Sequence, residues 1–250
     1  MKQLFILLLL AGTPALHCQN LLDDQGQKTG FWKVEDASGN TLYEARFQHG
    51  NPVGEMVRYY ENGTVRARMM FDSLEDKSFT KLYYKNGKQA AEGWYVNRSK
   101  DSVWTYFSEF DGSVRIRESY QNGNLHGIVR SYYSTGVVSE EVHWQNNIKN
   151  GAWKQFYEDG SIRLVCGYRG GMLDGSYELF YPDSTLKVRG FYLKNQKHDA
   201  WSFFDESGKE SYSIEYLLGR AVHQEKFQQM MADSLEKYQL ISEPETMQHY

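Results

Sequence analysis

Hydrophobic and polar residues alternate along short stretches of the chain, which is the pattern of β-strands with one buried face. Residues 65–71 and 162–168 are clear examples, and each follows a turn dipeptide, Asn62-Gly63 or Asp159-Gly160. In the second stretch the apolar column is Ile162, Leu164, Cys166 and Tyr168. Strands joined by Asn-Gly or Asp-Gly predict a β-hairpin in which both central turn residues have positive φ.

The hairpin pattern repeats about every 24 residues. Its turn residues are Gly39, Gly63, Gly87, Gly112, Gly136, Gly160, Ser184 and Gly208. The one irregular step, from Gly87 to Gly112, has 25 residues, and we expect the extra residue to form a β-bulge. Eight residues after each turn residue stands an aromatic side chain: Phe47, Phe71, Tyr95, Tyr120, Trp144, Tyr168, Tyr192 and Tyr216. Because aromatic residues make up only 15% of the chain, this column identifies eight structural repeats.

The first strand of each hairpin presents different side chains on its two faces. Trp153, Gln155 and Tyr157 share one face, and we expect such aromatic columns to pack the sheet, because large rings bury area against cross-strand neighbours. The opposite face is the candidate binding surface, with Tyr59, Lys81, Tyr83, Arg130, Tyr132, Lys154, Phe156 and Phe180 as its candidate residues. Tyrosine beside lysine or arginine can stack on rings or sugars, bind anionic groups or dock a protein. The alternative is a solvated face held together by cross-strand packing.

The motif Gly-x-Trp-x-x-(Phe/Tyr)-Tyr-x-(Asn/Asp)-Gly, as in residues 151–160, resembles that of MORN repeats. It is most similar to the bacterial variant found in proteins of the YwqK antitoxin family, and the resemblance covers roughly residues 24–219. It implies an all-β fold: an elongated antiparallel β-meander of about eight MORN-like hairpin repeats of 24 residues. The family label implies neutralisation of a toxin, and the resemblance implies no catalytic residue.

The N-terminal residues 1–20 are typical of an export signal. Basic Lys2 is followed by an apolar run that ends near Ala11, which is too short to span a membrane, and then by small residues. Cys18 raises the alternative of lipidation, but His17 makes a poor lipobox. We therefore predict a signal peptide at residues 1–20 and a repeat domain at 21–219.

The C-terminal residues 220–250 break the repeat pattern. Apolar residues recur there at helical spacing among helix-favouring glutamine, glutamate and lysine. The segment predicts an α-helix that caps the edge of the last hairpin, followed by a tail. A helix that docks a partner and a mostly mobile tail are the alternatives.

Composition and motif searches narrow the chemistry. The net charge of −4 argues against an extended nucleic-acid footprint, which needs a basic face. The seven histidines form no His-Glu-x-x-His pattern, and the two cysteines form no Cys-x-x-Cys pattern. Neither a nucleophile elbow nor a P-loop is present. We therefore expect no catalytic residue, cofactor or metal site, and we expect Cys166 to be a buried, inert thiol.

These observations predict an exported, non-enzymatic scaffold of the bacterial cell envelope that works through an unidentified protein partner. Its expected location is the periplasm, the outer membrane or the outside of the cell. One alternative is a toxin-neutralising, antitoxin-like protein, and another is a module that binds lipid headgroups or glycans of the envelope. The sequence predicts no transmembrane segment and leaves the oligomeric state open.

Overall fold

The computed structural model describes residues 19–72 and 76–222, and the strand pairings within each of its two units are antiparallel. The chain divides after Lys88 into an N-terminal unit and a C-terminal unit, which are described separately. The expected all-β antiparallel meander is confirmed within these residues. The predicted signal peptide, except for its last two residues, and almost all of the predicted C-terminal helix lie outside them.

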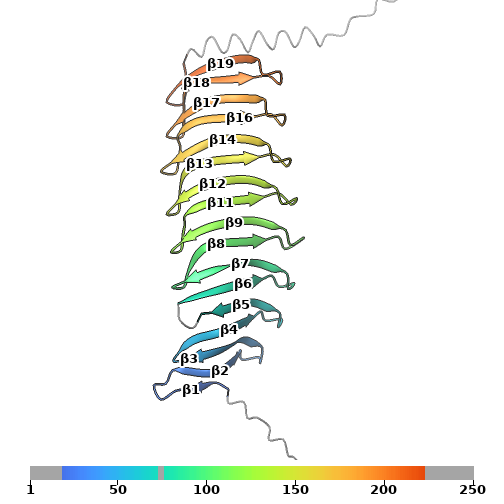
Figure 1. The fold of residues 1–250 in the computed structure, drawn as a ribbon, viewed down its shortest axis with the longest axis vertical. Helices are drawn as coiled ribbons and strands as arrows, with labels where there is room; N and C mark the ends of the chain where they lie inside the picture. Colours follow the sequence, from blue (N-terminus) through green and yellow to red (C-terminus); the bar gives the residue numbers. More distant parts are fainter. Residues whose placement is uncertain (1–18, 73–75, 223–250) are drawn as a thin grey trace, which may run out of the picture. The chain divides into compact units, whose positions relative to one another are not determined.

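The N-terminal unit is a meander in which each strand pairs with the next one in sequence (Figure 1). Its strands are β1 (Leu21–Leu22), β2 (Lys28–Glu35), β3 (Thr41–Gln48), β4 (Asn51–Tyr59), β5 (Val65–Phe71) and β6 (Lys77–Tyr83). Asn20 and β1 lie against the outer edge of β2, because the Asn20 side chain bonds both backbone groups of Lys33. The edge of β2 that does not pair with β3 is therefore partly covered.

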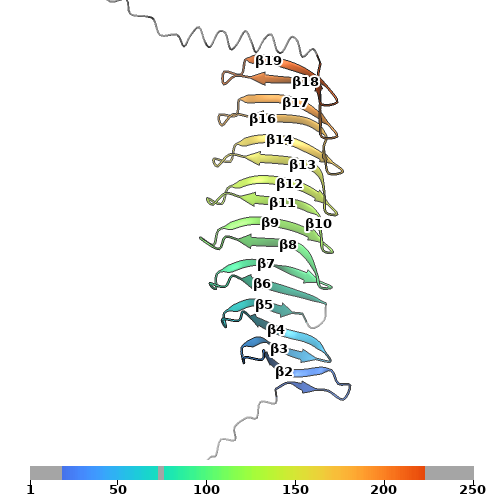
Figure 2. The same cartoon turned by 180° about the vertical axis from the view of Figure 1, so that it is seen from behind.

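The C-terminal unit has the same pattern, with eleven strands of six to nine residues and three strands of two residues. Its strands are β7 (Gln89–Val96), β8 (Ser99–Phe107), β9 (Val114–Gln121), β10 (Asn124–Leu125), β11 (Gly127–Tyr132), β12 (Val138–Gln145), β13 (Ile148–Phe156), β14 (Ile162–Arg169), β15 (Met172–Leu173), β16 (Gly175–Phe180), β17 (Leu186–Leu193), β18 (Gln196–Phe204), β19 (Glu210–Leu217) and β20 (Arg220–Ala221). In two repeats the first strand of the hairpin is interrupted and forms two shorter strands. These are β10 and β11, which both pair with β9, and β15 and β16, which both pair with β14. The strands succeed one another in sequence order, with turns along two opposite edges (Figures 1 and 2).

The turns at the glycine column are three-residue loops, so the predicted two-residue geometry is wrong there. Tyr60 N–H donates to Thr64 C=O at 2.8 Å, and Gly63 N–H donates to Tyr60 C=O at 2.9 Å. Gly63 has φ 79°, whereas Asn62 is not among the residues with positive φ. Its side chain instead accepts the N–H of Thr64 at 3.1 Å. A type I turn followed by one left-handed glycine uses the same Asn-Gly dipeptide as the predicted turn, with a different role for the asparagine.

The two-residue turns with positive φ at both positions lie at the opposite edge of the hairpins. Asn122 and Gly123 have φ of 50° and 83°, and Asn146 and Asn147 have φ of 50° and 64°. Asparagine and glycine tolerate this left-handed region better than other residues. The two edges of each unit thus carry two different kinds of turn.

The extra residue of the irregular repeat lies in the turn, so the predicted β-bulge is wrong at that place. Gly112 N–H donates to Ser108 C=O, which makes this loop one residue longer than the others, and Phe110 in it is 89% exposed. Strand irregularities occur elsewhere, nine residues before the turn residue. At Gly151, with φ 111°, three residues of β13 lie opposite one residue of β12. Such bulges bend a strand.

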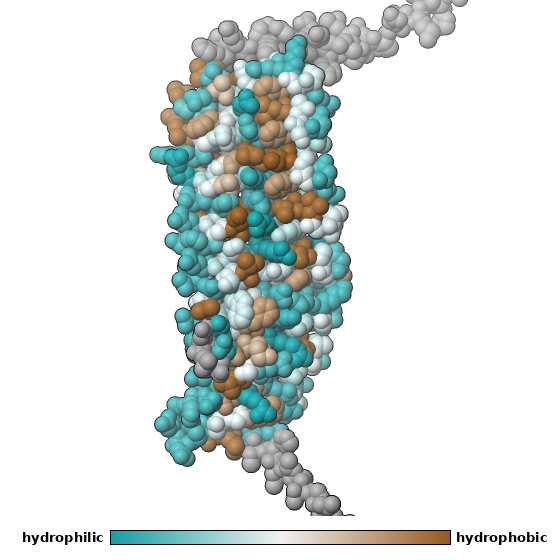
Figure 3. All heavy atoms as spheres, in the orientation of Figure 1, coloured by the Kyte–Doolittle hydropathy of each residue, from teal (hydrophilic) through white to brown (hydrophobic). Residues whose placement is uncertain are grey.

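One face of each sheet, here called the inner face, carries Trp153, Gln155, Tyr157 and the residues aligned with them. Among the residues that the structure describes, eleven hydrophobic ones are buried, and ten of them lie on the inner face: Ala45, Ala67, Ala91, Trp104, Val142, Leu164, Cys166, Val188, Trp201 and Ile214. The exception, Val57, lies on the other side, called the outer face. The predicted division between a packed and an open face is confirmed. In the view of Figure 3, hydrophobic residues of the C-terminal unit gather along the middle and hydrophilic ones along the turn edges.

Close approach of rings to the backbone explains two glycines on the inner face. A Cβ atom at Gly93 would overlap the ring of Trp104, and one at Gly190 would overlap the ring of Trp201. The two indoles also donate from Nε1 to the carbonyls of Trp94 and Phe191, at 2.9 and 3.1 Å. Both tryptophans are therefore fixed by packing and by a hydrogen bond.

The last described residues begin a further repeat, at the place where the sequence predicted the C-terminal capping helix and tail, residues 220–250, to begin. Leu218 and Gly219 form a two-residue turn, and β20 pairs with β19. Val222 N–H donates to Glu215 C=O at 2.8 Å. The same bond occurs two repeats earlier, where Asp174 N–H donates to Gly167 C=O at 3.0 Å. The repeat geometry therefore extends past the predicted boundary.

Tyrosine hydroxyls link four of the repeats to the repeat that follows. Each donates to a carbonyl 23 residues later: Tyr60 to Tyr83, Tyr133 to Phe156, Tyr157 to Phe180 and Tyr181 to Phe204, at 2.7, 2.7, 2.7 and 3.1 Å. The acceptor carbonyl lies just before the next turn, so the bond joins the ends of neighbouring hairpins. All four tyrosines stand three residues before the turn residue of their repeat.

We predict that Tyr157→Phe lowers the free energy of unfolding by about 1 kcal/mol, because the carbonyl of Phe180 loses its donor. Urea denaturation followed by tryptophan fluorescence measures the change. Tyr168→Phe is the matched control, because the Tyr168 hydroxyl makes no hydrogen bond with the residues described, and we expect it to be nearly neutral. Equal effects of the two substitutions would contradict the proposed role of the hydroxyl.

Candidate functional site

The eight residues proposed from sequence all lie half-buried on the outer face. The N-terminal unit holds Tyr59, Lys81 and Tyr83, and the C-terminal unit holds the other five: Arg130, Tyr132, Lys154, Phe156 and Phe180. The cross-strand partners of the charged members are charged too: Lys81 lies opposite Arg68, and Arg130 and Lys154 both lie opposite Glu141. The residues are thus arranged on a surface and not around a pocket.

A row of residues across the strands of the C-terminal unit carries charges of both signs. Its members, each the cross-strand partner of the next, are Arg117, Arg130, Glu141, Lys154, Val165, Glu178 and Arg189. Arg130 Nε donates to Glu141 at 2.6 Å, and Arg189 Nε donates to Glu178 at 3.3 Å. Arg117 has a different contact, because its guanidinium lies 5.5 Å from the centre of the Tyr132 ring. The outer face therefore combines ion pairs with exposed cationic and aromatic groups.

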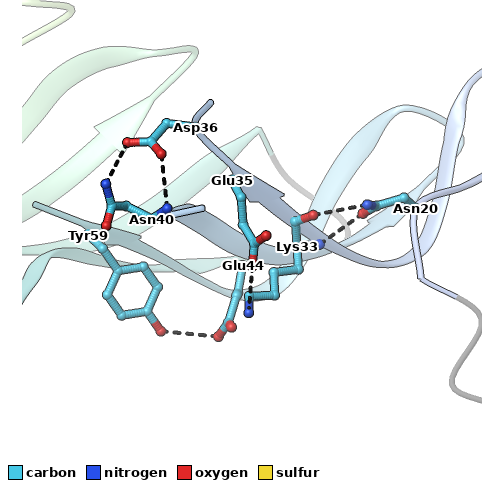
Figure 4. Close-up of polar contacts among 7 residues, drawn as sticks. All are labelled: Asn20, Lys33, Glu35, Asp36, Asn40, Glu44 and Tyr59. Atoms are coloured by element: carbon cyan, nitrogen blue, oxygen red, sulfur yellow. Dashed lines mark hydrogen bonds and ion pairs between the residues drawn. The ribbon is translucent and has the colours of Figure 1, made fainter. Parts of the chain in front are cut away.

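The first two hairpins of the N-terminal unit hold a set of polar contacts, shown in Figure 4. The Tyr59 hydroxyl donates to the Glu44 carboxylate at 3.1 Å, and Lys33 pairs with Glu35 at 2.9 Å. Asp36 accepts the backbone and side-chain N–H groups of Asn40, both at 2.9 Å. These bonds lower the pKa of the Asp36 carboxyl group. The candidate Tyr59 is therefore already engaged by a carboxylate of its own sheet.

The sequence reasoning missed a lysine column on the inner face. Four lysines stand four residues before a tryptophan, in the pairs Lys28–Trp32, Lys100–Trp104, Lys149–Trp153 and Lys197–Trp201. The ammonium of Lys197 lies 4.2 Å from the centre of the Trp201 ring and 5.0 Å from that of Tyr216, and burial lowers the pKa of this lysine. Lys28 and Lys100 lie over the rings of Trp32 and Trp104 in the same way, whereas Lys149 lies over Tyr168 and Trp144. The spacing Lys-x-x-x-Trp was the signal that could have revealed the three cation–π contacts of Lys28, Lys100 and Lys197.

The strongest electrostatic perturbation lies around Tyr106 on the inner face. Lys100 Nζ donates to the Tyr106 hydroxyl at 2.5 Å, and the Tyr120 hydroxyl donates to Glu118 at 2.7 Å. Burial, helped by hydrogen bonds with Glu118 and Tyr120, raises the pKa of Tyr106 far above its usual range. Burial also raises the pKa of Tyr120 to about 12. Both hydroxyls remain protonated at neutral pH and act as structural groups.

Other reactive groups occupy structural positions in the part of the chain that is described. Cys166 is 5% exposed, and burial raises the pKa of its thiol, in keeping with the expected inert role. His198 Nδ1 accepts the backbone N–H of Leu218 at 3.4 Å, next to a turn. Within residues 19–72 and 76–222, no group of histidine, cysteine and acidic side chains is placed to hold a metal ion. In the same residues, no helix is long and apolar enough to span a membrane.

Comparison with known families identifies the repeat. The family described as MORN repeat variant matches residues 52–73, 125–146 and 149–168. These three segments are MORN-variant repeats. All three matched segments start eleven residues before a turn glycine, and each spans one hairpin, so the MORN-variant repeat has the same phase as the hairpins described above. No curated protein matches the chain in sequence.

The raised pKa values of Tyr106 and Tyr120 predict loss of stability at high pH. Above pH 10 the unfolded chain releases these protons while the folded state retains them, so the stability present below pH 10 is lost as pH rises toward 12. Each group can contribute at most about 1.4 kcal/mol per pH unit. Urea unfolding between pH 7 and about pH 11 should therefore show a shallower alkaline loss for Tyr106→Phe than for the wild type.

Between pH 7 and 9 the two proteins should show the same pH dependence, which serves as the internal control. An alkaline loss of equal steepness in both proteins would contradict the assignment of Tyr106.

Proposed function

We propose that this MORN-repeat β-hairpin protein is an exported, non-enzymatic scaffold of the bacterial cell envelope that works by binding another protein. The observation that carries the proposal is the difference in burial and charge between the two faces of the sheet. Ten of eleven buried hydrophobic residues lie on the inner face, while the outer face presents half-buried rings beside charged side chains. Tyrosine, phenylalanine and arginine are enriched where proteins bind proteins, so an open sheet face with these side chains suits such contact.

The repeated polar groups support a structural role in place of a catalytic one. Tyrosine hydroxyls donate to backbone carbonyls, and turn aspartates such as Asp159 and Asp205 accept N–H groups within their own loops. The inner-face lysines lie over aromatic rings. Each of these groups already has a partner in its own sheet, so none of them is poised for chemistry on a substrate.

The resemblance to YwqK-family antitoxins refines the identity of the partner. A toxin is itself a protein, and its neutralisation requires only a binding surface that covers or distorts it. The export expected from residues 1–20 then requires a toxin that acts in the envelope or outside the cell. An antitoxin role is thus a special case of the proposed scaffold, and the identity of the captured protein decides between the two.

The proposal predicts that the outer face, and not the inner face, touches a protein in living cells. A photo-crosslinking amino acid at Phe156 should capture one or a few specific proteins, because this ring lies on the outer face. The same residue at Leu164, which is 4% exposed on the inner face, is the matched control and should capture none. Mass spectrometry identifies the product, and binding of the purified partner to the purified chain then verifies it.

Cell fractionation in the same experiment tests the location. Recovery of the protein in the periplasm, the outer membrane or the medium is the expected result. Capture of no protein from outer-face positions across several growth conditions, or recovery of the full-length chain in the cytoplasm, would contradict the corresponding part of the proposal.

A further inference from the structure

A four-residue pattern occurs twice on the outer face, once in each unit. It consists of two arginines on one strand, two residues apart, and a basic residue and a tyrosine on the next strand, also two residues apart. The N-terminal copy is Arg66, Arg68, Lys81 and Tyr83, and the C-terminal copy is Arg115, Arg117, Arg130 and Tyr132. In both copies the two central basic residues are direct cross-strand partners, Arg68 with Lys81 and Arg117 with Arg130.

Like charges directly opposite each other destabilise an antiparallel pair. The N-terminal copy reduces this cost, because Arg68 Nη1 donates to the Glu55 carboxylate at 2.8 Å. In the C-terminal copy the corresponding Arg117 is exposed and has no carboxylate partner among the described residues; its contact is the Tyr132 ring. The sheet therefore keeps the positive charge of Arg117 exposed and opposite a second arginine, which is unfavourable for the sheet itself. Such an arrangement is typical of a site that binds an external anion.

The neighbours of Arg117 leave part of the cationic surface open. Arg130 is bonded to Glu141 through Nε, and its side chain remains 40% exposed. Arg115 lies 3.9 Å from Asp111, too far for a strong hydrogen bond, and its side chain is 41% exposed. Three arginines thus lie on the same face as Tyr132, with the guanidinium of Arg117 over the tyrosine ring and the carboxylates of Asp111 and Glu141 at the margin.

We propose that Arg115, Arg117, Arg130 and Tyr132, here called the arginine patch, bind an extended acidic segment of the protein partner. Residues two apart on one strand are separated by about 6.6–6.8 Å, which is also the spacing of alternate side chains in an extended peptide. A segment with carboxylates at alternate positions can therefore place one acid on Arg115 and the next on Arg117. Guanidinium groups bind carboxylates in a bidentate manner, and the Tyr132 ring offers a surface for the intervening side chain.

The surroundings favour a discrete acidic peptide over a nucleic acid or an anionic membrane. Both of those partners present many phosphates and require a wide basic surface, whereas the patch has Asp111 on one side and Glu141 on the other. The chain as a whole carries a net charge of −4. This inference rests on the proposed function, because the acidic segment belongs to the protein partner.

The test measures binding of the full-length chain to a fluorescein-labelled peptide of ten residues with alternating glutamate and threonine, by fluorescence anisotropy at about 50 mM salt. We expect it to bind about tenfold or more tightly than the same peptide with glutamine in place of glutamate. Arg117→Glu should weaken binding of the glutamate peptide by a similar factor. Arg163→Glu, the same charge change at an exposed outer-face arginine away from the patch, should alter it by less than about twofold.

Two further measurements separate binding from folding. Arg117→Glu should raise the thermal midpoint by about 1–3 °C, because it replaces a like-charge pair with an opposite-charge pair. Arg68→Glu should weaken peptide binding less than Arg117→Glu, since Arg68 is already held by Glu55. A variant that binds less while it melts higher cannot owe its loss of binding to unfolding.

Several results would overturn the patch. These are equal binding of the glutamate and glutamine peptides, equal losses in Arg117→Glu and Arg163→Glu, or a lowered thermal midpoint in Arg117→Glu. Binding of phosphatidylglycerol vesicles that depends on Arg117, without peptide binding, would assign the patch to a membrane and would also reject it. If cross-linking from Phe156 still captures a protein partner in that case, only the patch fails and the scaffold function stands.

Discussion

Packing of aromatic rings on the inner face is the interaction on which the rest of the structure depends. Strands in each unit pair with their neighbours in sequence, so an ordinary core between two layers does not form among the described residues. Rings supply the buried area in its place: Trp104 is 0% exposed and Trp201 is 2% exposed, on a sheet that is a single layer thick. Neighbouring rings pack edge-on against these tryptophans: the ring centres of Tyr95 and Trp104 are 4.9 Å apart, and those of Tyr192 and Trp201 are 5.0 Å apart.

The other features of the repeat serve this packing. Bulges at residues such as Gly151 bend the strands, and lysines such as Lys197 extend their apolar stems over the rings while the ammonium meets the aromatic surface. Tyrosine hydroxyls and the two kinds of turn fix the hairpin ends. Because the stabilising packing lies on the inner face, the outer face can carry varied charged and aromatic side chains. The arginine patch lies on this outer face.

Much of the fold could be predicted from the sequence, because two periods are visible at once. The alternation within residues 162–168 separates the faces, and the 24-residue recurrence of the turn residues places every hairpin. The turn geometry could not be predicted, since Asn62-Gly63 suits both a two-residue turn and a type I turn with a left-handed glycine. The lysine column was missed because alternation treats lysine as solvent-facing. The pairing of Arg117 with Arg130 depends on the register between strands, which a single sequence does not reveal.

The most direct test of this account compares two tryptophans on opposite faces of the C-terminal unit. Trp104 is fully buried on the inner face, and Trp94 is 37% exposed on the outer face of the neighbouring strand. Urea unfolding should show that Trp104→Ala lowers the free energy of unfolding by about 3–5 kcal/mol, while Trp94→Ala lowers it by less than about 1.5 kcal/mol. Equal losses for the two variants would contradict the claim that inner-face rings hold the protein together.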